Sequence, residues 1–230
     1  MKKEERGGEG MDRVIGREVT PVTILAGGRS RRMGVDKAFV EFQGQPLIRR
    51  MIDLSRSFSA EVSLILHPDQ FTSQPYRSLA VQFGLDLIAD DYDHHGPLGG
   101  LATALRYHYK LTDKLTANPA ATPPAILLLP CDMPFLTLRL LEQLLRDHTE
   151  TGAEATIVNH QNRFRQPLPG AYSTSILPVV TRQIESGQLK FDHIFSQIRT
   201  TLITFEDPDN PHLFANLNNP AELEAAQLLS

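Results

Sequence analysis

The sequence predicts an α/β fold in which a mostly parallel central sheet carries helices on both faces. Short β-branched or apolar runs alternate along the chain with longer segments whose apolar residues recur at helical spacing. No internal repeat is visible in the 230 residues, a length that suits one α/β domain. Glycine-rich or acidic turns follow several of the apolar runs, at the strand ends where sheets of this kind bind ligands.

The first 129 residues contain four of the expected strands. Pairing in the first strand, Val19–Ile24, should begin after Pro21, because proline cannot donate a ladder hydrogen bond. Helical spacing of apolar residues predicts a helix over Leu47–Ser57, and Pro97 sits in a favourable first-turn position for a helix over Leu98–Tyr109. The other elements expected here are strands over 62–66, 85–89 and 125–129, and a weak helix over 70–80 that Pro75 interrupts.

The second half adds three strands and the closing helices. Residues 113–124 are rich in proline and alanine without periodicity, which predicts a surface loop. Thr137 is a plausible cap for a helix over 136–149. Residues 1–18 are expected to be a disordered lead-in and residues 19–230 a single domain. The remaining elements expected are strands over 155–159, 164–172 and 200–205, and helices over 174–186, 191–197 and 220–229.

Composition limits the classes of function. A net charge of −4 argues against general binding to nucleic acids or to membrane surfaces. No apolar run approaches the roughly 18 residues of a membrane span. The single cysteine cannot form an internal disulfide, and the charged N-terminus does not resemble a signal peptide. We therefore expect a cytoplasmic protein that binds neither nucleic acid nor membrane.

A glycine-rich, positively charged segment, Leu25–Lys37, follows the first strand. Two adjacent glycines let the backbone turn and let a ligand approach without meeting a Cβ atom. The stretch from residue 29 to residue 37 contains three arginines, Lys37 and one carboxylate, Asp36, so its net charge is +3. Amide groups at the end of a strand also suit an anion. The segment therefore predicts a site for a triphosphate.

Two well-known phosphate loops do not fit this segment. The Walker pattern needs four residues between its glycines and a Ser or Thr after the lysine, whereas five residues separate Gly28 from Gly34 and Ala38 follows Lys37. The dinucleotide pattern G-x-G-x-x-G is absent because Gly27 and Gly28 are adjacent.

The segment does match L-A-G-G-x-S-x-R-M-G-x-D-K at every fixed position, and it resembles the nucleotidyltransferases related to molybdenum cofactor guanylyltransferase. The resemblance covers roughly residues 19–228. It implies a Rossmann-like nucleotidyltransferase fold and transfer of GMP from GTP to the phosphate of metal-loaded molybdopterin, with release of pyrophosphate. The further motifs that carry it are Gly96–Gly100, Pro130–Pro134, Gln166–Leu168 with Tyr172, and Asn216–Pro220.

Two residues are expected to be catalytic. Asp132 follows a strand without polar side chains, and a carboxylate there, beside phosphates, suits Mg²⁺; the alternative is a cap on the helix that starts near Thr137. Lys37 would stabilise negative charge as pyrophosphate leaves; the alternative is a solvated helix lysine. Cys131 reads as a small apolar filler, not a nucleophile.

The resemblance implies two further groups of contacts. His67 stands where relatives often carry an asparagine near the nucleotide, and His94 and His95 are expected to be exposed loop residues. The asparagines near residue 216 also have an alternative reading as turn residues. The nucleotide-binding residues implied are Leu25, Ala26, Gly27, Gly28, Arg32, Lys37, Asp90 and Asp132. The acceptor-binding residues implied are Gly96, Pro97, Leu98, Gln166, Pro167, Asn216 and Asn218.

Rival functions remain open at this stage. CTP-using relatives carry L-A-A-G in the first loop, and the Leu25–Gly28 stretch reads L-A-G-G, which favours guanine. We expect Gly28, which lacks a Cβ atom, to leave room for the larger base. The alternatives are cytidylyl transfer, nucleotidyl transfer to a sugar phosphate, and a non-catalytic nucleotide-binding regulator. The partners implied are GTP, molybdopterin, and other proteins of molybdenum cofactor synthesis or acceptors of the cofactor.

Overall fold

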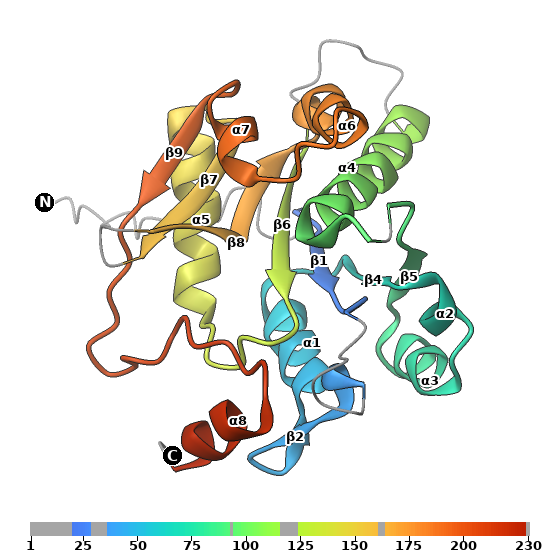
Figure 1. Ribbon diagram of the computed structural model, residues 1–230, viewed down its shortest axis with the longest axis vertical. Helices are drawn as coiled ribbons and strands as arrows, with labels where there is room; N and C mark the ends of the chain where they lie inside the picture. Colours follow the sequence, from blue (N-terminus) through green and yellow to red (C-terminus); the bar gives the residue numbers. More distant parts are fainter. Residues whose placement is uncertain (1–19, 29–35, 93, 116–123, 161–163, 229–230) are drawn as a thin grey trace, which may run out of the picture.

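A seven-stranded sheet runs through the molecule (Figure 1). The computed structural model describes residues 20–28, 36–92, 94–115, 124–160 and 164–228. The strands of this sheet are β1 (Val22–Leu25), β4 (Val62–Leu66), β5 (Asp86–Ala89), β6 (Ala125–Pro130), β7 (Ala155–His160), β8 (Phe164–Ser173) and β9 (Thr200–Ile203). Their order across the sheet is β5-β4-β1-β6-β8-β7-β9.

The sheet is mostly parallel, as predicted. Parallel pairing joins β1 to β4 and β6, β4 to β5, and β7 to β9. Strand β8 is antiparallel to both of its neighbours, β6 and β7, so within the described sheet it is the strand that runs the opposite way. The carboxyl ends of β1, β4, β5 and β6 therefore meet at one rim, where the beginning of β8 joins them.

Helices cover both faces of the sheet, which was also predicted (Figure 1). Apolar side chains of α1 and α5 belong to one buried cluster, and those of α4, α6 and α7 belong to the other. Neighbouring strand residues alternate between the clusters: Leu127 and Leu129 point to the first, Ile126 and Leu128 to the second. The helices are α1 (Leu47–Phe58), α2 (Pro68–Phe71), α3 (Gln74–Phe83), α4 (Gly96–Leu115), α5 (Leu138–Thr151), α6 (Leu177–Glu185), α7 (Phe191–Phe195) and α8 (Pro220–Gln227).

Proline residues mark two places where the prediction can be checked. Pairing of β1 begins at Val22, after Pro21, as expected. The single weak helix expected over 70–80 is wrong, because the chain forms two helices, α2 and α3, with a turn between them. Pro75 lies in the first turn of α3, where its missing N–H has no helical partner to lose. It therefore helps to start the second helix instead of interrupting one.

The segment after the glycine-rich loop contains structure that the sequence did not predict. A 3₁₀ turn, η1 (Lys37–Phe39), leads into a small hairpin of β2 (Glu41–Phe42) and β3 (Gln45–Pro46). Phe42 is fully buried and packs edge-on against Phe135, 5.3 Å between ring centroids. It also shares a small apolar cluster with Leu217. The hairpin thereby ties the end of the loop to the C-terminal segment.

The loop expected at 113–124 begins later than predicted, because α4 continues to Leu115. Most of that loop, residues 116–123, lies outside the described residues, as does the predicted lead-in at 1–18. No helix in the described ranges combines the length and the apolar character needed to span a membrane.

Two buried histidines make hydrogen bonds inside the protein. His148 contacts Thr156 through Nδ1 at 3.1 Å and Ser173 through Nε2 at 3.0 Å. His108 contacts Thr23 through Nε2 at 3.0 Å. Burial lowers the pKa of each imidazole from 6.5 to about 4, against a smaller opposing effect of Asp86 on His108. Both side chains are therefore neutral in the folded protein at physiological pH.

We expect the free energy of unfolding to fall as the pH drops from about 6.5 to about 4. In that window the unfolded chain binds protons that the folded histidines do not, which costs up to about 3 kcal/mol for each histidine. Urea unfolding of the unmodified protein and of His148→Gln at several pH values measures the effect. The variant should lose less stability on acidification, and an equal loss in both proteins would contradict the assignment.

Candidate active site

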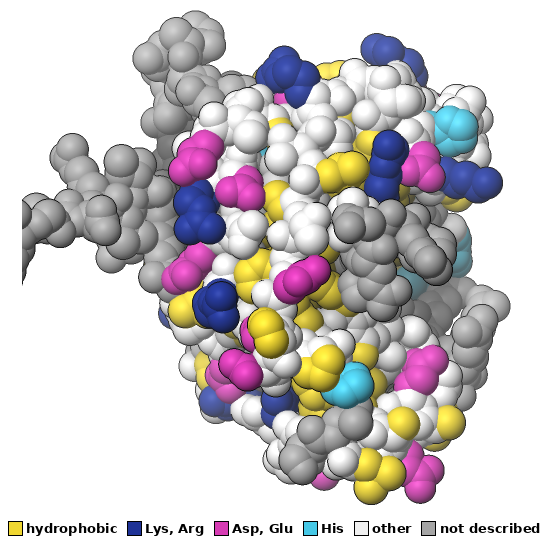
Figure 2. All heavy atoms as spheres, turned by 90° about the vertical axis from the view of Figure 1, so that its left-hand side faces the viewer, with side chains coloured by type: hydrophobic (Ala, Val, Ile, Leu, Met, Phe, Trp, Pro, Cys, Tyr) yellow, Lys and Arg dark blue, Asp and Glu magenta, His cyan; other side chains and the backbone are white. Residues whose placement is uncertain are grey.

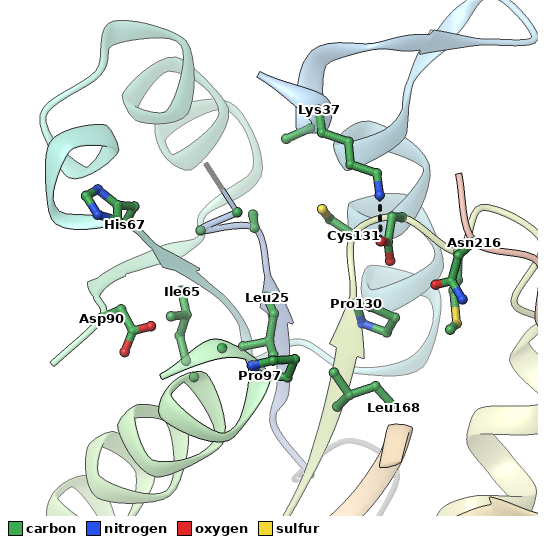
Figure 3. A pocket seen from close by; sticks show the side chains of 18 of the residues that line it. Leu25, Lys37, Ile65, His67, Asp90, Pro97, Pro130, Cys131, Leu168 and Asn216 are labelled. Atoms are coloured by element: carbon green, nitrogen blue, oxygen red, sulfur yellow. Dashed lines mark hydrogen bonds and ion pairs between the residues drawn. The ribbon is translucent and has the colours of Figure 1, made fainter. Parts of the chain in front are cut away.

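A cleft of about 720 Å³ lies at the rim where the parallel strands end (Figure 3). One side is built by the ends of β1, β4 and β5 and the start of α4. The other side is built by the end of β6, the beginning of β8 and the C-terminal segment. The predicted site residues that line it are Leu25, Ala26, Gly27, Gly28, Lys37, Asp90, Gly96, Pro97, Asp132, Gln166, Pro167, Asn216 and Asn218.

Two predicted site residues are not among those that line the cleft. Leu98 was expected to contact the acceptor, but its side chain is fully buried in the apolar cluster beneath α4. Pro97 and Gly100 on the same helix do line the cleft, so the helix turns Leu98 away from it. Arg32 lies outside the described residues.

Lys37 and Asp132 both line the cleft and form an ion pair, which the dashed line from Lys37 marks in Figure 3. The ammonium Nζ of Lys37 donates to Oδ2 of Asp132 at 2.7 Å and to Oδ1 of Asn218 at 2.8 Å. The two charged side chains are only 14% and 21% exposed. Lys37 is thus not a solvated helix lysine. Its ammonium joins η1 to the end of β6 and to the C-terminal segment.

Asp132 does not cap helix α5, which was the alternative to a metal site. The N-cap of α5 is Thr137, and even its hydroxyl makes no capping hydrogen bond. The carboxylate of Asp132 instead faces the cleft, while its backbone carbonyl accepts from the amide of Leu217 at 2.9 Å. Asp132 therefore joins the end of β6 to the C-terminal segment.

Cys131, next to Asp132, is not a nucleophile. Burial, with a smaller contribution from the Asp132 carboxylate, raises the pKa of its thiol to about 12. Because the thiolate is the reactive form, this cysteine is inert at neutral pH. Its side chain belongs to the apolar cluster under α1 and α5, as expected of a small apolar filler.

Asp90 directly follows β5 and lies on the opposite side of the cleft from Lys37 and Cys131 (Figure 3). Its Oδ1 accepts hydrogen bonds from the amide of Tyr92 at 3.0 Å and from the hydroxyl of Thr103 at 2.7 Å. These contacts fix the carboxylate against the start of α4, in an orientation that lets it face a ligand in the cleft.

Two histidines also line this side of the cleft. His67, named from the sequence without a role, is buried and caps α2, with Nδ1 accepting from the amide of Asp69 at 3.1 Å. His94 is exposed, as expected, but it lines the cleft as well, and its φ of 73° is unusual for a residue with a side chain. The rings lie 6.2 Å apart. The sequence signals for His67 were its place directly after a strand and its match to a position where relatives often carry an asparagine near the nucleotide.

The two adjacent glycines of the loop have different surroundings. A Cβ atom at Gly27 would lie 2.7 Å from the amide nitrogen of His67 and 3.1 Å from the carbonyl carbon of Leu66. A Cβ atom at Gly28 would meet no described atom within 4 Å. The difference from L-A-A-G falls at position 27, so our link between that difference and Gly28 was wrong. Gly27 allows β1 and β4 to end close together, and Gly28 borders the open cleft.

A metal in this cleft would need ligands from a bound molecule. The described residues include no group of three or more His, Cys, Asp or Glu side chains that could hold an ion. The Asp132 carboxylate offers hard oxygen atoms, and Mg²⁺ is often bound by one or two carboxylates together with phosphate oxygens and water. The donor set therefore fits Mg²⁺ delivered with a phosphate compound.

The surface away from the cleft shows no sign of a nucleic-acid site on the face that Figure 2 displays. On the described part of this face, Lys and Arg side chains alternate with Asp and Glu side chains and form no continuous basic area. A mixed surface of this kind gives little attraction for a polyanion.

Several known proteins resemble this chain in sequence or in fold. Residues 22–199 match the MobA-like NTP transferase domain. A probable molybdenum cofactor guanylyltransferase of Flavobacterium johnsoniae is 31% identical over 206 residues, covering 90% of this chain and 95% of the relative. A molybdenum cofactor guanylyltransferase of Vibrio atlanticus is 29% identical over 89% of this chain and 93% of the relative. The crystal structure of molybdopterin-guanine dinucleotide biosynthesis protein A from Archaeoglobus fulgidus has a TM-score of 0.72 at 22% identity, covering 91% of this chain and 98% of that one, which shows a shared fold.

Proposed function

Because the chain belongs to the MobA-like NTP transferase family, we propose that it transfers GMP from GTP to the phosphate of molybdopterin in molybdenum cofactor synthesis. The observation that carries the proposal is the Lys37–Asp132 ion pair, 2.7 Å long, in the lining of a two-sided cleft. One side has the glycine loop and Asp90 for a nucleotide. The other has Gln166, Asn216 and their neighbours for an acceptor.

The reaction requires an in-line displacement at phosphorus. An oxygen of the molybdopterin phosphate forms a bond to the α-phosphorus of GTP, the bond from that phosphorus to the bridging oxygen breaks, and pyrophosphate leaves. Such transfers depend on positioning and on neutralising charge, so no protein nucleophile is needed. The inert Cys131 is consistent with this mechanism. The ammonium of Lys37 would bind the phosphate oxygens whose charge increases as pyrophosphate departs.

Mg²⁺ is the cofactor that this site would hold, through the carboxylate of Asp132. When bound, Mg²⁺ supplies neutralisation of charge on the phosphate oxygens. Asp132 is paired with Lys37 in the protein alone. The triphosphate would offer Lys37 a second anionic partner, which leaves the Asp132 carboxylate available to the ion. Nucleotide and metal are therefore expected to bind together.

The test is a set of turnover reactions with Mg²⁺, each of the four nucleoside triphosphates, and either metal-loaded molybdopterin or a sugar phosphate as the acceptor, followed by measurement of pyrophosphate. We expect GTP to give the fastest release. If pyrophosphate is released fastest with CTP, the activity is cytidylyl transfer. If it is released only with a sugar phosphate, the acceptor is not molybdopterin. A protein that GTP protects from thermal unfolding, but that forms no pyrophosphate, would be a nucleotide-binding regulator.

The base preference can be tested at Gly28. Because the space beside Gly28 is open, an effect of Gly28→Ala on turnover requires the bound base to lie against residue 28. In that arrangement we expect the variant to lower kcat/KM for GTP by tenfold to more than a hundredfold, since a misfit of one methyl group against the base costs about 1–3 kcal/mol. The loss with CTP should be much smaller. Because the added Cβ meets no described atom, the melting temperature should stay the same. The measurements are kcat/KM for both nucleotides at fixed Mg²⁺.

Gly27→Ala is the matched control for this experiment. Its Cβ would press on the backbone at Leu66 and His67, so the variant should be less stable and should lose activity with both nucleotides. If Gly28→Ala reduces kcat/KM equally for GTP and CTP, then Gly28 serves the triphosphate and does not select the base.

A further inference from the structure

The carboxylate of Asp36 is bound by three donors from different parts of the chain. Its Oδ1 accepts from the amide of Ala38 at 3.1 Å, which caps the turn η1. Its Oδ2 accepts from the side-chain amide of Gln70 at 2.7 Å and from the hydroxyl of Tyr76 at 2.9 Å. Gln70 belongs to α2 and Tyr76 to α3, so one side chain connects η1 to both helices.

The partners of Asp36 are themselves held in place. Tyr76 is fully buried and packs edge-on against Phe39 of η1, 4.9 Å between ring centroids. Burial and the Asp36 carboxylate raise the pKa of its phenol well above the ordinary value, so Tyr76 remains a donor at neutral pH. The side-chain oxygen of Gln70 accepts from the amide of His67 at 3.2 Å. The three donors thus hold the Asp36 carboxylate in one position.

Asp36 and Lys37 are neighbours in the chain, but their side chains bind different parts of the protein. The Asp36 carboxylate is held by α2 and α3, which follow β4, whereas the Lys37 ammonium reaches Asp132 at the end of β6. The hydrogen-bond partners described for Asp36 are neutral groups, so the contacts do not describe an ion pair with Lys37. Asp36 can therefore influence Lys37 by fixing the backbone of η1, from which the lysine extends.

We propose that Asp36 is a positioning residue that, through Gln70 and Tyr76, fixes η1 so that the Lys37 ammonium lies against Asp132. The effect on catalysis rests on the proposed function; the effect on the position of Lys37 does not. A displacement of about 1 Å can cost about a hundredfold in rate, so a group that fixes the start of η1 matters although it does not contact the reacting atoms.

The position of Lys37 can be measured in the protein alone. Competitive labelling with acetic anhydride, followed by mass spectrometry, reports the reactivity of each lysine amine. In Asp36→Ala we expect labelling of Lys37 to rise about fivefold. This rise corresponds to a loss of about 1 kcal/mol in the free energy that favours the position of the ammonium against Asp132. The exposed Lys110 and Lys190 should keep their reactivity. Asp36→Asn retains an acceptor for the Ala38 amide and should give a smaller rise, so it tests the same point if Asp36→Ala does not fold.

A double-mutant cycle measures the catalytic consequence. Asp36→Ala should lower kcat/KM by roughly ten- to a hundredfold in the unmodified protein, and by less than about twofold in a Lys37→Met background, because the two changes remove one function. Asp53→Ala is the matched control. Asp53 also accepts hydrogen bonds from a glutamine and an arginine, but on an exposed part of α1 away from the cleft lining.

The outcomes separate this inference from the proposed function. Unchanged labelling of Lys37 in the folded Asp36 variants, or an equal loss of activity in both Lys37 backgrounds, would overturn the positioning role. If the unmodified protein forms no pyrophosphate from any nucleotide, the proposed function fails while the labelling experiment still decides the role of Asp36.

Discussion

Asp132→Asn should reduce guanylyl transfer by at least about 10²–10³-fold while the protein remains folded. The substitution keeps the size and polarity of the side chain but removes the negative charge that a hard cation needs. It also removes the anionic partner of Lys37, 2.7 Å away. The measurement is kcat/KM for GTP over a series of Mg²⁺ concentrations, with the melting temperature of each protein as a check on folding.

The matched control for this prediction is Asp91→Asn. Asp91 is an exposed carboxylate close to the cleft that pairs with Arg106 and does not line the cleft. Its replacement should leave turnover nearly unchanged. If Asp132→Asn retains most of its activity at limiting Mg²⁺, Asp132 does not hold the metal.

Lys37→Met should cause a loss of similar size, roughly 10²–10³-fold in kcat/KM, because it removes a charge aimed at the phosphates without adding bulk. We expect kcat to fall with it, since the charge on the leaving pyrophosphate is greatest in the transition state. The measurement is full saturation kinetics with GTP for the variant and the unmodified protein.

Lys190→Met serves as the control, since Lys190 is exposed beyond α6 and does not line the cleft. A loss confined to KM in Lys37→Met would show that Lys37 only helps to bind GTP in its ground state. That result would leave the family assignment in place but would remove Lys37 from the catalytic residues.

The strands and long helices could be predicted because their signals are local. Val62–Leu66 is an apolar run between polar turns, and it forms a strand with those bounds. Three residues separate His160 from Phe164, too few for a parallel crossover, so β8 has to run antiparallel to β7. The place of β8 beside β6 could not be predicted, because nothing within Phe164–Ser173 selects that neighbour. The hairpin of β2 and β3 has strands of two residues each, too short for any periodic pattern. Its position depends on contacts with distant residues such as Phe135.

The site could be predicted as far as topology determines it. In a parallel sheet the residues after successive strands meet at one rim, which is why Gly28, Asp90 and Asp132 were expected to lie together and do. The direction in which a single side chain points depends on tertiary packing, which the sequence motif does not reveal. Leu98 is an example. It lies within a motif of which Gly96, Pro97 and Gly100 line the cleft, yet its own side chain fills the core.

The contact between Lys37 and Asn218 joins residues 181 positions apart. Next to it, the amide of Leu217 donates a hydrogen bond to the backbone carbonyl of Asp132. A ribosome adding about 5–20 residues per second needs roughly 10–35 seconds to proceed from Lys37 to Asn218. The residues assigned to the nucleotide end at Asp132, so they are all synthesised well before Asn216 and Asn218, which line the other side of the cleft. The order of synthesis therefore separates the two sides of the cleft in time, and the corner that joins Lys37 and Asp132 to Asn218 is completed last.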